Sequence, residues 1–176
     1  MRILLHVCCG PCTIYPLQLL RAQGHRVEGY FFNPNIHPYK EFKKRINTLK
    51  ELADLEKFPI NINQNYGLRE YLRRVVFHEQ ERCSVCYDLR LEEVARTAGK
   101  MNVDAFSSTL LYSRYQNHAL IREKSELLAQ KFGVAFHYQD FRSGWQEGID
   151  RAKEMGLYRQ PYCGCIYSEQ ERYDKK

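Results

Sequence analysis

Seven cysteines gathered in three short motifs are the residues of this chain best suited to chemistry. Every cysteine belongs to one of these motifs, which are C-C-x-x-C (Cys8, Cys9 and Cys12), C-x-x-C (Cys83 and Cys86) and C-x-C (Cys163 and Cys165). Thiolates gathered in this way are typical of soft-metal ligation or of redox chemistry. The sequence therefore predicts a metal or redox site built from segments that lie far apart along the chain.

The spacing within each motif limits what it could bind. A C-x-C motif in an extended chain points both thiols to one side, whereas the adjacent Cys8 and Cys9 would point to opposite sides and suit two metal atoms better than one. A four-iron cluster and a structural zinc each need four ligands, so seven thiols leave three over. The surplus could bind a second metal, act as redox thiols or lie outside the site. Cys12, near a predicted helix, could be only a buried apolar cysteine.

Length and composition narrow the class of protein. The chain has 176 residues, enough for one domain to bury a core without disulfide staples. It opens with a short apolar run that does not resemble a secretory signal, and no segment approaches the roughly 20 apolar residues of a membrane span. We therefore expect a cytoplasmic monomer that makes no contact with a membrane. In that reducing compartment clustered thiols more often bind metal or do redox work than form structural disulfides, and the odd number of cysteines argues against full pairing.

Short apolar runs alternate with stretches of helical periodicity along the chain. The runs predict strands at residues 2–8, 27–32, 58–62, 105–109 and 134–138. Helices are expected at residues 13–23, 39–57, 68–76, 114–132 and 149–155, and the C-x-x-C motif is expected at the start of a further helix that ends at Gly99. This alternation favours an α/β, Rossmann-like three-layer fold with a mostly parallel sheet of about five strands.

The turn after the first strand excludes one common activity of such a sheet, whose ligands bind beyond the carboxyl ends of the strands. Enzymes that split ATP to adenylate and pyrophosphate there use a glycine-rich phosphate loop, whereas this chain has Gly10 followed by Pro11. Those residues offer few backbone N–H groups to an anion, so nucleotide hydrolysis is disfavoured. The expected fold resembles the adenine-nucleotide hydrolase-like (PP-loop/HUP) architecture without its phosphate loop.

Several long and specific motifs cover nearly the whole chain. They are LLHVCCGPC (4–12), YFFNPNIHP (30–38) with Glu41 and Arg45, CSVCY (83–87) with Arg90 and Leu91, STLLYS (108–113) and YRQPYCGC (158–165). These motifs resemble those of one family, the cobalamin-independent epoxyqueuosine reductases (QueH type). One departure is Ser113-Arg114-Tyr115, where Ser-Pro-Tyr is usual in the family.

The resemblance implies a tRNA-modifying reductase that converts epoxyqueuosine to queuosine at the anticodon wobble position. It implies a four-iron (4Fe-4S) cluster, room for an additional mononuclear iron, no cobalamin and an external electron donor. Removal of an epoxide oxygen takes two electrons and two protons, and an iron–sulfur cluster is a one-electron carrier. The tRNA that carries epoxyqueuosine is the implied partner.

We expect the cysteines to form one composite site. Cys83, Cys86, Cys163 and Cys165, with Cys8 and Cys9, are predicted to surround the iron, and residues 1–176 to form one α/β domain whose C-terminal segment, from about residue 140, folds back to complete it. Asp140, beside Arg142, is the predicted proton donor, although a role as a loop cap fits Asp140 equally well. His6, in the first strand, is expected to be a packed core histidine, and no spacing argument assigns a role to His37 or His118.

The net charge of +6 fits either a polyanionic partner or an ordinary mixed-charge surface. For the RNA interpretation, the candidate contacts are Lys43, Lys44, Arg45, Arg73, Arg74, Arg114, Tyr115 and Arg159. Arg45 and Arg74 could equally be surface charges. Two other functions stay open: a zinc-stabilised, non-catalytic RNA-binding module, and a thiol–disulfide oxidoreductase that uses Cys83 and Cys86 and leaves five cysteines unexplained.

Overall fold

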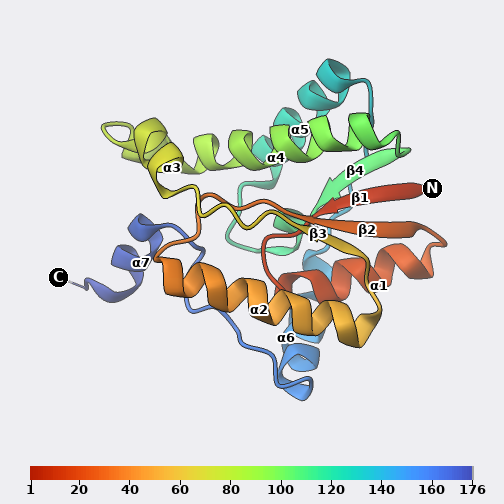
Figure 1. The fold of residues 1–176 in the computed structure, drawn as a ribbon, viewed down its shortest axis with the longest axis horizontal. Coiled ribbons are helices and arrows are strands. Elements are labelled where there is room, and N and C mark those ends of the chain that lie inside the picture. The colour runs from red at the N-terminus through yellow and green to blue at the C-terminus, as the bar shows by residue number, and fades with distance from the viewer. Residues whose placement is uncertain (176) are drawn as a thin grey trace.

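The computed structural model, which describes residues 1–175, has a central sheet of parallel strands in the order β3-β2-β1-β4-β5, of which Figure 1 labels β1, β2, β3 and β4. All four strand pairings are parallel. The strands are β1 (Arg2–His6), β2 (Arg26–Phe31), β3 (Ile60–Ile62), β4 (Ala105–Ser108) and β5 (Ala135–Phe136). The predicted α/β fold with about five mostly parallel strands is therefore confirmed.

Helices connect the strands and follow the last of them. They are α1 (Ile14–Ala22), α2 (Tyr39–Glu56), α3 (Leu68–Val75), α4 (Arg82–Met101), α5 (His118–Phe132), α6 (Trp145–Glu154) and α7 (Ile166–Tyr173). Short 3-10 turns lie at Pro11–Thr13, Glu79–Glu81, Thr109–Tyr112 and Arg142–Gly144. Among the described residues, no helix has the length and apolarity that crossing a membrane requires.

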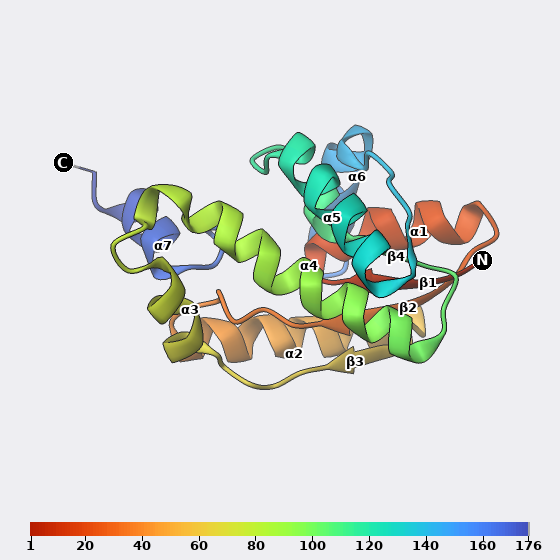
Figure 2. The ribbon, with the colours of Figure 1, turned by 90° about the horizontal axis from the view of Figure 1, so that it is seen from above.

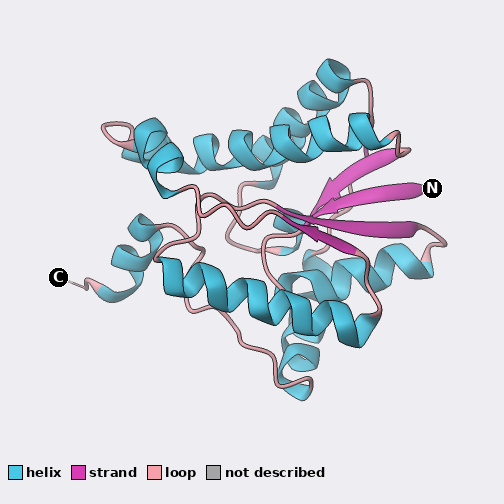
Figure 3. Cartoon of the chain, in the orientation of Figure 1, coloured by secondary structure: helices cyan, strands magenta, loops and turns pink. Residues whose placement is uncertain are grey.

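Both faces of the sheet are buried, because side chains along a strand alternate in direction and helices cover each face. On one face Leu4 and Phe106 pack in a cluster with Val94 of α4. On the other face, Leu5 packs in a cluster with Phe42 of α2. Figures 2 and 3 show helices on both sides of the strands, which gives the three expected layers.

Several elements begin or end away from their predicted positions, and α5 and α6 differ most. Helix α5 begins at His118 and not near residue 114, because the side chain of Asn117 caps it by accepting a hydrogen bond from the Leu120 N–H. Helix α6 begins at Trp145, four residues before the predicted start, and β5 is two residues long. Helix α7 was not predicted. It lies in the tyrosine-rich tail, where the Cys165 sulfur accepts from the Ser168 N–H at its start.

The carboxyl ends of β1 and β4 mark the crevice in which sheets of this type bind ligands. From β1 the strand order runs to β2 and β3 on one side and to β4 and β5 on the other, so the crossover direction reverses there. Cys8 lies two residues beyond β1 and Thr109 directly follows β4. The Cys8 N–H donates to the Thr109 hydroxyl at 3.0 Å, which joins the two strand ends at this point.

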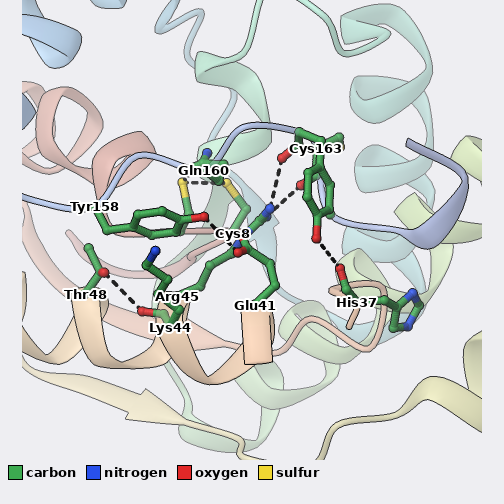
Figure 4. Close-up of polar contacts among 12 residues, drawn as sticks. Cys8, His37, Glu41, Lys44, Arg45, Thr48, Tyr158, Gln160 and Cys163 are labelled. Atoms are coloured by element: carbon green, nitrogen blue, oxygen red, sulfur yellow. Dashed lines mark hydrogen bonds and ion pairs between the residues drawn. The ribbon is translucent and has the colours of Figure 1, made fainter. Parts of the chain in front are cut away.

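Arg45, in the middle of α2, fastens the C-terminal segment to this end of the sheet (Figure 4). Its guanidinium donates to the main-chain carbonyls of Cys163 at 2.7 Å and Tyr162 at 2.9 Å, while its Nε donates to the Glu41 carboxylate at 2.7 Å. The loop before α2 adds a backbone bond of 2.8 Å from the His37 N–H to the Gly164 carbonyl. These bonds bring Cys163 and Cys165 back beside segments more than a hundred residues earlier.

The same contacts correct the expectation that Arg45 touches RNA. Its side chain is only 2% exposed, so it is neither a phosphate contact nor an ordinary surface charge. Because three acceptors from two segments surround the guanidinium, Arg45 has a structural role.

Replacing Arg45 by methionine should therefore lower the free energy of unfolding by about 3–5 kcal/mol, because it leaves the buried Glu41 carboxylate unpaired. Urea melts measure the change, and limited proteolysis reports release of the C-terminal segment. Arg74→Met is the matched control: its pair with Glu70 has the same four-residue spacing but is half exposed, so a change below about 1 kcal/mol is expected. Equal losses in the two variants would contradict the fastening role of Arg45.

Candidate metal centre

The first cysteine motif forms a compact thiol trio, defined here as Cys8, Cys9 and Cys12. Their sulfur atoms all lie within 4.8 Å of one another, close enough to bind one metal ion. The chain bends at Cys8 and Gly10 is helical, which leads into the 3-10 turn that carries Cys12. The prediction that Cys8 and Cys9 point to opposite sides was therefore wrong, because it assumed extended backbone. Their sulfurs lie 4.0 Å apart.

The other four cysteines form a second set, called here the four-cysteine group (Cys83, Cys86, Cys163 and Cys165). Cys83 and Cys86 lie in the first turns of α4, and Cys165 caps α7. Cys86 and Cys165 pack in one cluster with Tyr71. Burial raises the pKa of Cys83, and the neighbouring thiols of Cys163 and Cys165 raise it further. The four thiols thus face a common region, although within residues 1–175 only the trio brings three donor atoms within 4.8 Å.

Arg90 carries a positive charge into the space between the two sets of thiols. Its side chain on α4 is 2% exposed, and its Nε donates to the Cys86 carbonyl at 3.1 Å. Burial alone would lower the pKa of Arg90, but the negative charge available on Cys86, Cys163 and Cys8 raises it overall. Across residues 1–175 no carboxylate is paired with this guanidinium. A buried cation without a carboxylate fits an anionic, sulfur-rich group bound beside it.

Tyr71 supplies a second sign that something binds at the four-cysteine group. It is fully buried, and among the described residues its hydroxyl has no nitrogen or oxygen partner, only the thiol of Cys165 beside it. Buried polar atoms are nearly always paired, so such a hydroxyl beside Cys86 and Cys165 fits a site that accepts a sulfur-bearing or metal-bearing group.

Hydrogen bonds within the trio favour one thiolate, on Cys8. The thiols of Cys12 and Cys9 lower the pKa of Cys8 well below its usual range, and the Thr109 hydroxyl, 3.1 Å from the sulfur, adds to this against the effect of burial. Burial in turn raises the pKa of Cys9. A low thiol pKa favours metal binding, because the thiolate is the form that binds.

His6, the last residue of β1 and two residues before Cys8, is a hydrogen-bonded core histidine, as expected. Its ring nitrogens lie 3.0 Å from the Ser108 hydroxyl and 3.2 Å from the Phe32 carbonyl. Burial lowers the pKa of His6 to about 4, so the ring is neutral near pH 7.

A cleft of about 620 Å³ opens between the two sets of cysteines. Cys12 of the trio and Cys163 of the four-cysteine group both line it. The Gln160 amide donates to the sulfurs of Cys9 at 2.9 Å and Cys12 at 3.3 Å, and Gln116 donates to Cys163 at 3.4 Å. The remaining lining residues are aromatic, basic or small apart from one aliphatic side chain, and they are Pro11, Tyr112, Ser113, Tyr115, Trp145, Gly148, Ile149, Arg159, Pro161, Tyr162 and Arg172. A substrate in this cleft can reach both sets of thiols.

The predicted RNA contacts are spread over three places. Arg159 and Tyr115 line the cleft beside Arg114, whereas Arg73 and Arg74 line a separate open cleft of about 590 Å³ along α3. Lys43 and Lys44 lie on α2, where the Lys44 ammonium sits 3.7 Å from the centre of the Tyr158 ring.

The predicted proton donor, Asp140, is paired with Arg142 at 2.6 Å on a half-exposed loop. Hydrogen bonds from Arg142 lower the pKa of Asp140 to about 2, so this carboxyl is ionised near pH 7 and holds no proton to donate in this arrangement. The pairing argues for the alternative role as a loop cap, since Asp140 also accepts from the Arg142 N–H.

Sequence reasoning missed Arg90, Tyr71, Gln116, Gln160 and Trp145 as site residues. Arg90 did give a signal, because it lies four residues after Cys86 on a helix face that is otherwise apolar. Trp145, the only tryptophan, gave none, because its place beside the cleft depends on where α6 packs.

Three comparisons relate this chain to known proteins. The family model described as "Epoxyqueuosine reductase QueH" matches residues 3–171. A protein of that name from Dehalococcoides mccartyi is 37% identical over 99% of this chain and 96% of its own length, and one from Thermotoga maritima is 34% identical over 98% and 93%. A crystal structure titled as a predicted subunit of a tRNA methyltransferase from Methanocaldococcus jannaschii superposes with a TM-score of 0.57 at 12% identity, over 88% of this chain and 75% of that one. This last likeness shows the fold alone.

Removing the Thr109 hydroxyl should raise the pKa of Cys8 in the reduced, metal-free protein. A hydrogen bond to a charged group contributes about 1.5–3 kcal/mol, so in Thr109→Val the pH at which alkylation of Cys8 reaches half of its maximal rate should rise by about one unit or more. The reason is that the thiolate of Cys8 loses one of the hydrogen bonds that lower its pKa. Peptide mapping after iodoacetamide treatment gives the rate at each cysteine.

Thr109→Ser keeps the hydroxyl and should react like the wild type, and Thr97→Val on α4 controls for the loss of a threonine elsewhere. An unchanged pH profile of Cys8 alkylation in Thr109→Val would show that this hydroxyl does not stabilise the thiolate.

Proposed function

Because the chain belongs to the epoxyqueuosine reductase QueH family, we propose that its two sets of cysteines hold an iron centre that reduces epoxyqueuosine in tRNA to queuosine. Family membership makes the protein an oxidoreductase of queuosine biosynthesis that acts on epoxyqueuosine-modified tRNA. The observation that carries the metal proposal is a cleft whose wall contains Cys12 of the trio and Cys163 of the four-cysteine group.

The reaction consumes two electrons, so the site must hold a reducing group, and we propose a bound iron–sulfur cluster in that role. The epoxide oxygen leaves as water, an alkene remains, and two electrons and two protons are consumed. When bound, an iron–sulfur cluster supplies electrons one at a time and an iron with an open coordination position polarises the epoxide oxygen. An external electron donor must reduce the centre again after each turnover. We further propose that the protein is a monomer that binds its tRNA in the cytoplasm.

The two sets of thiols divide the ligands in a natural way. Four thiolates match the needs of a four-iron cluster, so we assign it to the four-cysteine group, and the trio is then left for an additional iron. The buried Arg90 and the buried Tyr71 hydroxyl support an anionic group beside Cys86. The C-terminal segment, held by Arg45, supplies Cys163 and Cys165, which supports a single domain completed by its own tail.

The residues of the chain itself position the thiols and the substrate. The amides of Gln160 and Gln116 hold the sulfurs of Cys9, Cys12 and Cys163 at the cleft wall. Arg159 and Tyr115 at the cleft are the proposed contacts to RNA. The exposed Arg73 and Arg74 on α3 lie in a separate cleft and would extend the contact with phosphates.

The deciding experiment is anaerobic reconstitution with iron and sulfide, followed by reduction and incubation with tRNA that carries epoxyqueuosine. The modified nucleoside should lose one oxygen by mass. Cys163→Ala should remove the visible iron–sulfur absorption, whereas Cys12→Ala should keep most of it but lose iron counted per chain and lose turnover. A colourless protein that binds zinc and tRNA without turnover would support the RNA-binding alternative.

Arg90 should tune the centre that the four-cysteine group holds. Reduction adds negative charge, and a nearby buried cation favours that change, so Arg90→Met should make the midpoint potential more negative. The expected shift is on the order of 60 mV, a tenfold change in a one-electron equilibrium. Anaerobic redox titration of the visible spectrum measures it.

Arg90→Lys keeps the charge and should retain most of the potential, and Arg96→Met, half exposed on the same helix, should leave it unchanged. If Arg90→Met holds full iron at an unchanged potential, the charge of Arg90 has no part in the centre.

A further inference from the structure

We propose that Trp145 and Tyr115 form a stacking platform for an unpaired base of the tRNA anticodon loop, at the mouth of the cleft that Cys12 and Cys163 line. This inference rests on the proposed function, since it takes tRNA as the partner. It deepens that function by naming the surface that receives a base and the residues that hold this surface in place.

The base of the platform is rigid. The rings of Tyr112 and Trp145 are stacked with centroids 5.1 Å apart and an angle of 30° between their planes. Tyr112 is buried, and its hydroxyl donates to the Trp145 carbonyl at 2.8 Å. Helix α6 comes close because residue 148 is glycine: a Cβ there would lie 2.3 Å from the Tyr112 hydroxyl. Trp145 is thereby fixed from below while part of its ring stays exposed to the cleft.

Tyr115 stands out from this base with 86% of its surface exposed. Its ring meets Trp145 edge-on at 5.8 Å, and its N–H donates to the Ser113 hydroxyl at 3.2 Å. The next residue, Gln116, accepts from the Tyr87 hydroxyl at 2.8 Å. Residues 115 and 116 are therefore held by hydrogen bonds, and the Tyr115 ring faces solvent before any ligand binds. A pre-positioned ring loses little entropy when a flat ligand stacks on it.

The charges around the platform identify the ligand. Arg159 and Arg172 line the cleft, and the guanidinium of Arg114 lies 5.7 Å from the centre of the Trp145 ring. In the described part of the chain none of these three arginines is ion-paired, and the cleft lining contains no carboxylate. Exposed aromatic rings beside free cations are the features with which proteins hold single-stranded RNA, by stacking bases and contacting phosphates.

The second open cleft makes a useful contrast. Arg73 and Arg74 line it together with Glu70, and Arg74 is partly neutralised by that glutamate at 3.7 Å. Its one aromatic lining residue, Tyr66, packs against Tyr39 and Phe42 and is not presented to solvent as Tyr115 is. The observations therefore favour the platform of Trp145 and Tyr115 as the place where a base stacks.

Binding of a fluorescent anticodon stem-loop RNA to the reconstituted protein tests the platform without turnover. Tyr115→Ala should weaken binding roughly tenfold, the usual scale for loss of one stacked base. Tyr115→Phe should bind like the wild type. The loss should disappear with an RNA that lacks one particular loop base, because the partner of the ring is then already missing. Trp145 is the only tryptophan, so RNA should also change the intrinsic fluorescence of the protein.

Two controls separate stacking from charge and from general damage. Arg159→Gln should reduce the salt dependence of binding by about one unit of slope, whereas Tyr115→Ala should leave that slope unchanged. Tyr138→Ala removes another exposed tyrosine, which lies near Arg122 and outside the cleft lining, and should bind RNA like the wild type.

The stacking proposal is wrong if Tyr115→Ala binds RNA as tightly as the wild type. It is also wrong if Tyr115→Ala loses the same affinity for every RNA that lacks one loop base. It is also overturned if Tyr115→Ala slows electron delivery without changing RNA affinity, because the surface would then serve a protein donor. Tight, Tyr115-dependent RNA binding by a protein that does not convert epoxyqueuosine would support the platform and contradict the proposed function, so the two can fail separately.

Discussion

The guanidinium of Arg45 is the interaction on which the site depends, because it joins the middle of α2 to the main chain of the C-terminal segment. The Arg45 contacts join two segments that lie more than a hundred residues apart, and bringing such segments together costs conformational entropy. Hydrogen bonds to the carbonyls of Tyr162 and Cys163 would not offset that cost if the guanidinium were free to move. The buried ion pair with Glu41 holds the Arg45 guanidinium in one position. The carbonyls of Tyr162 and Cys163 can therefore accept hydrogen bonds from it in only one arrangement of the C-terminal segment. The contacts go to backbone atoms, so the position of Cys163 follows from the path of the chain.

The two buried arginines of the site differ in their counter-charge, and the difference separates their roles. Arg45 has a carboxylate 2.7 Å away and needs no ligand to be stable. Arg90 has only the Cys86 carbonyl as a hydrogen-bond acceptor among the described residues, together with the sulfurs whose negative charge raises its pKa. A buried cation without a paired carboxylate destabilises the fold when its site is empty, and it is stabilised when an anion binds beside it. Arg45 therefore stabilises the fold, whereas Arg90 is placed to balance the charge of an anionic group bound at the site.

Sequence reasoning succeeded where local rules decide the outcome. Buried apolar runs predicted the strands, and the end of β1 predicted the position of Cys8, because both follow from periodicity and from the geometry of parallel sheets. It failed where distant segments pack. Arg45 looks like its exposed neighbour Lys44 in the sequence, and only the returning tail buries it. The thiols of Cys8 and Cys9 were misplaced because the bend at Cys8 could not be read from its residue type.

The crevice at the reversal of the strand order explains how chemistry and recognition share one end of the sheet. Sheets of this class place their ligand between the ends of two neighbouring strands, and here Cys8 after β1 and Thr109 after β4 occupy that position. The platform residues come from other elements, the segment before α5 and the start of α6. Tyr112 stacks on Trp145 and lies in the same 3-10 turn as Thr109, which contacts Cys8. That turn therefore sets how far the trio lies from the surface proposed to hold the base. Rigid coupling of this kind lets a substrate anchored by its base present a distant epoxide to the centre.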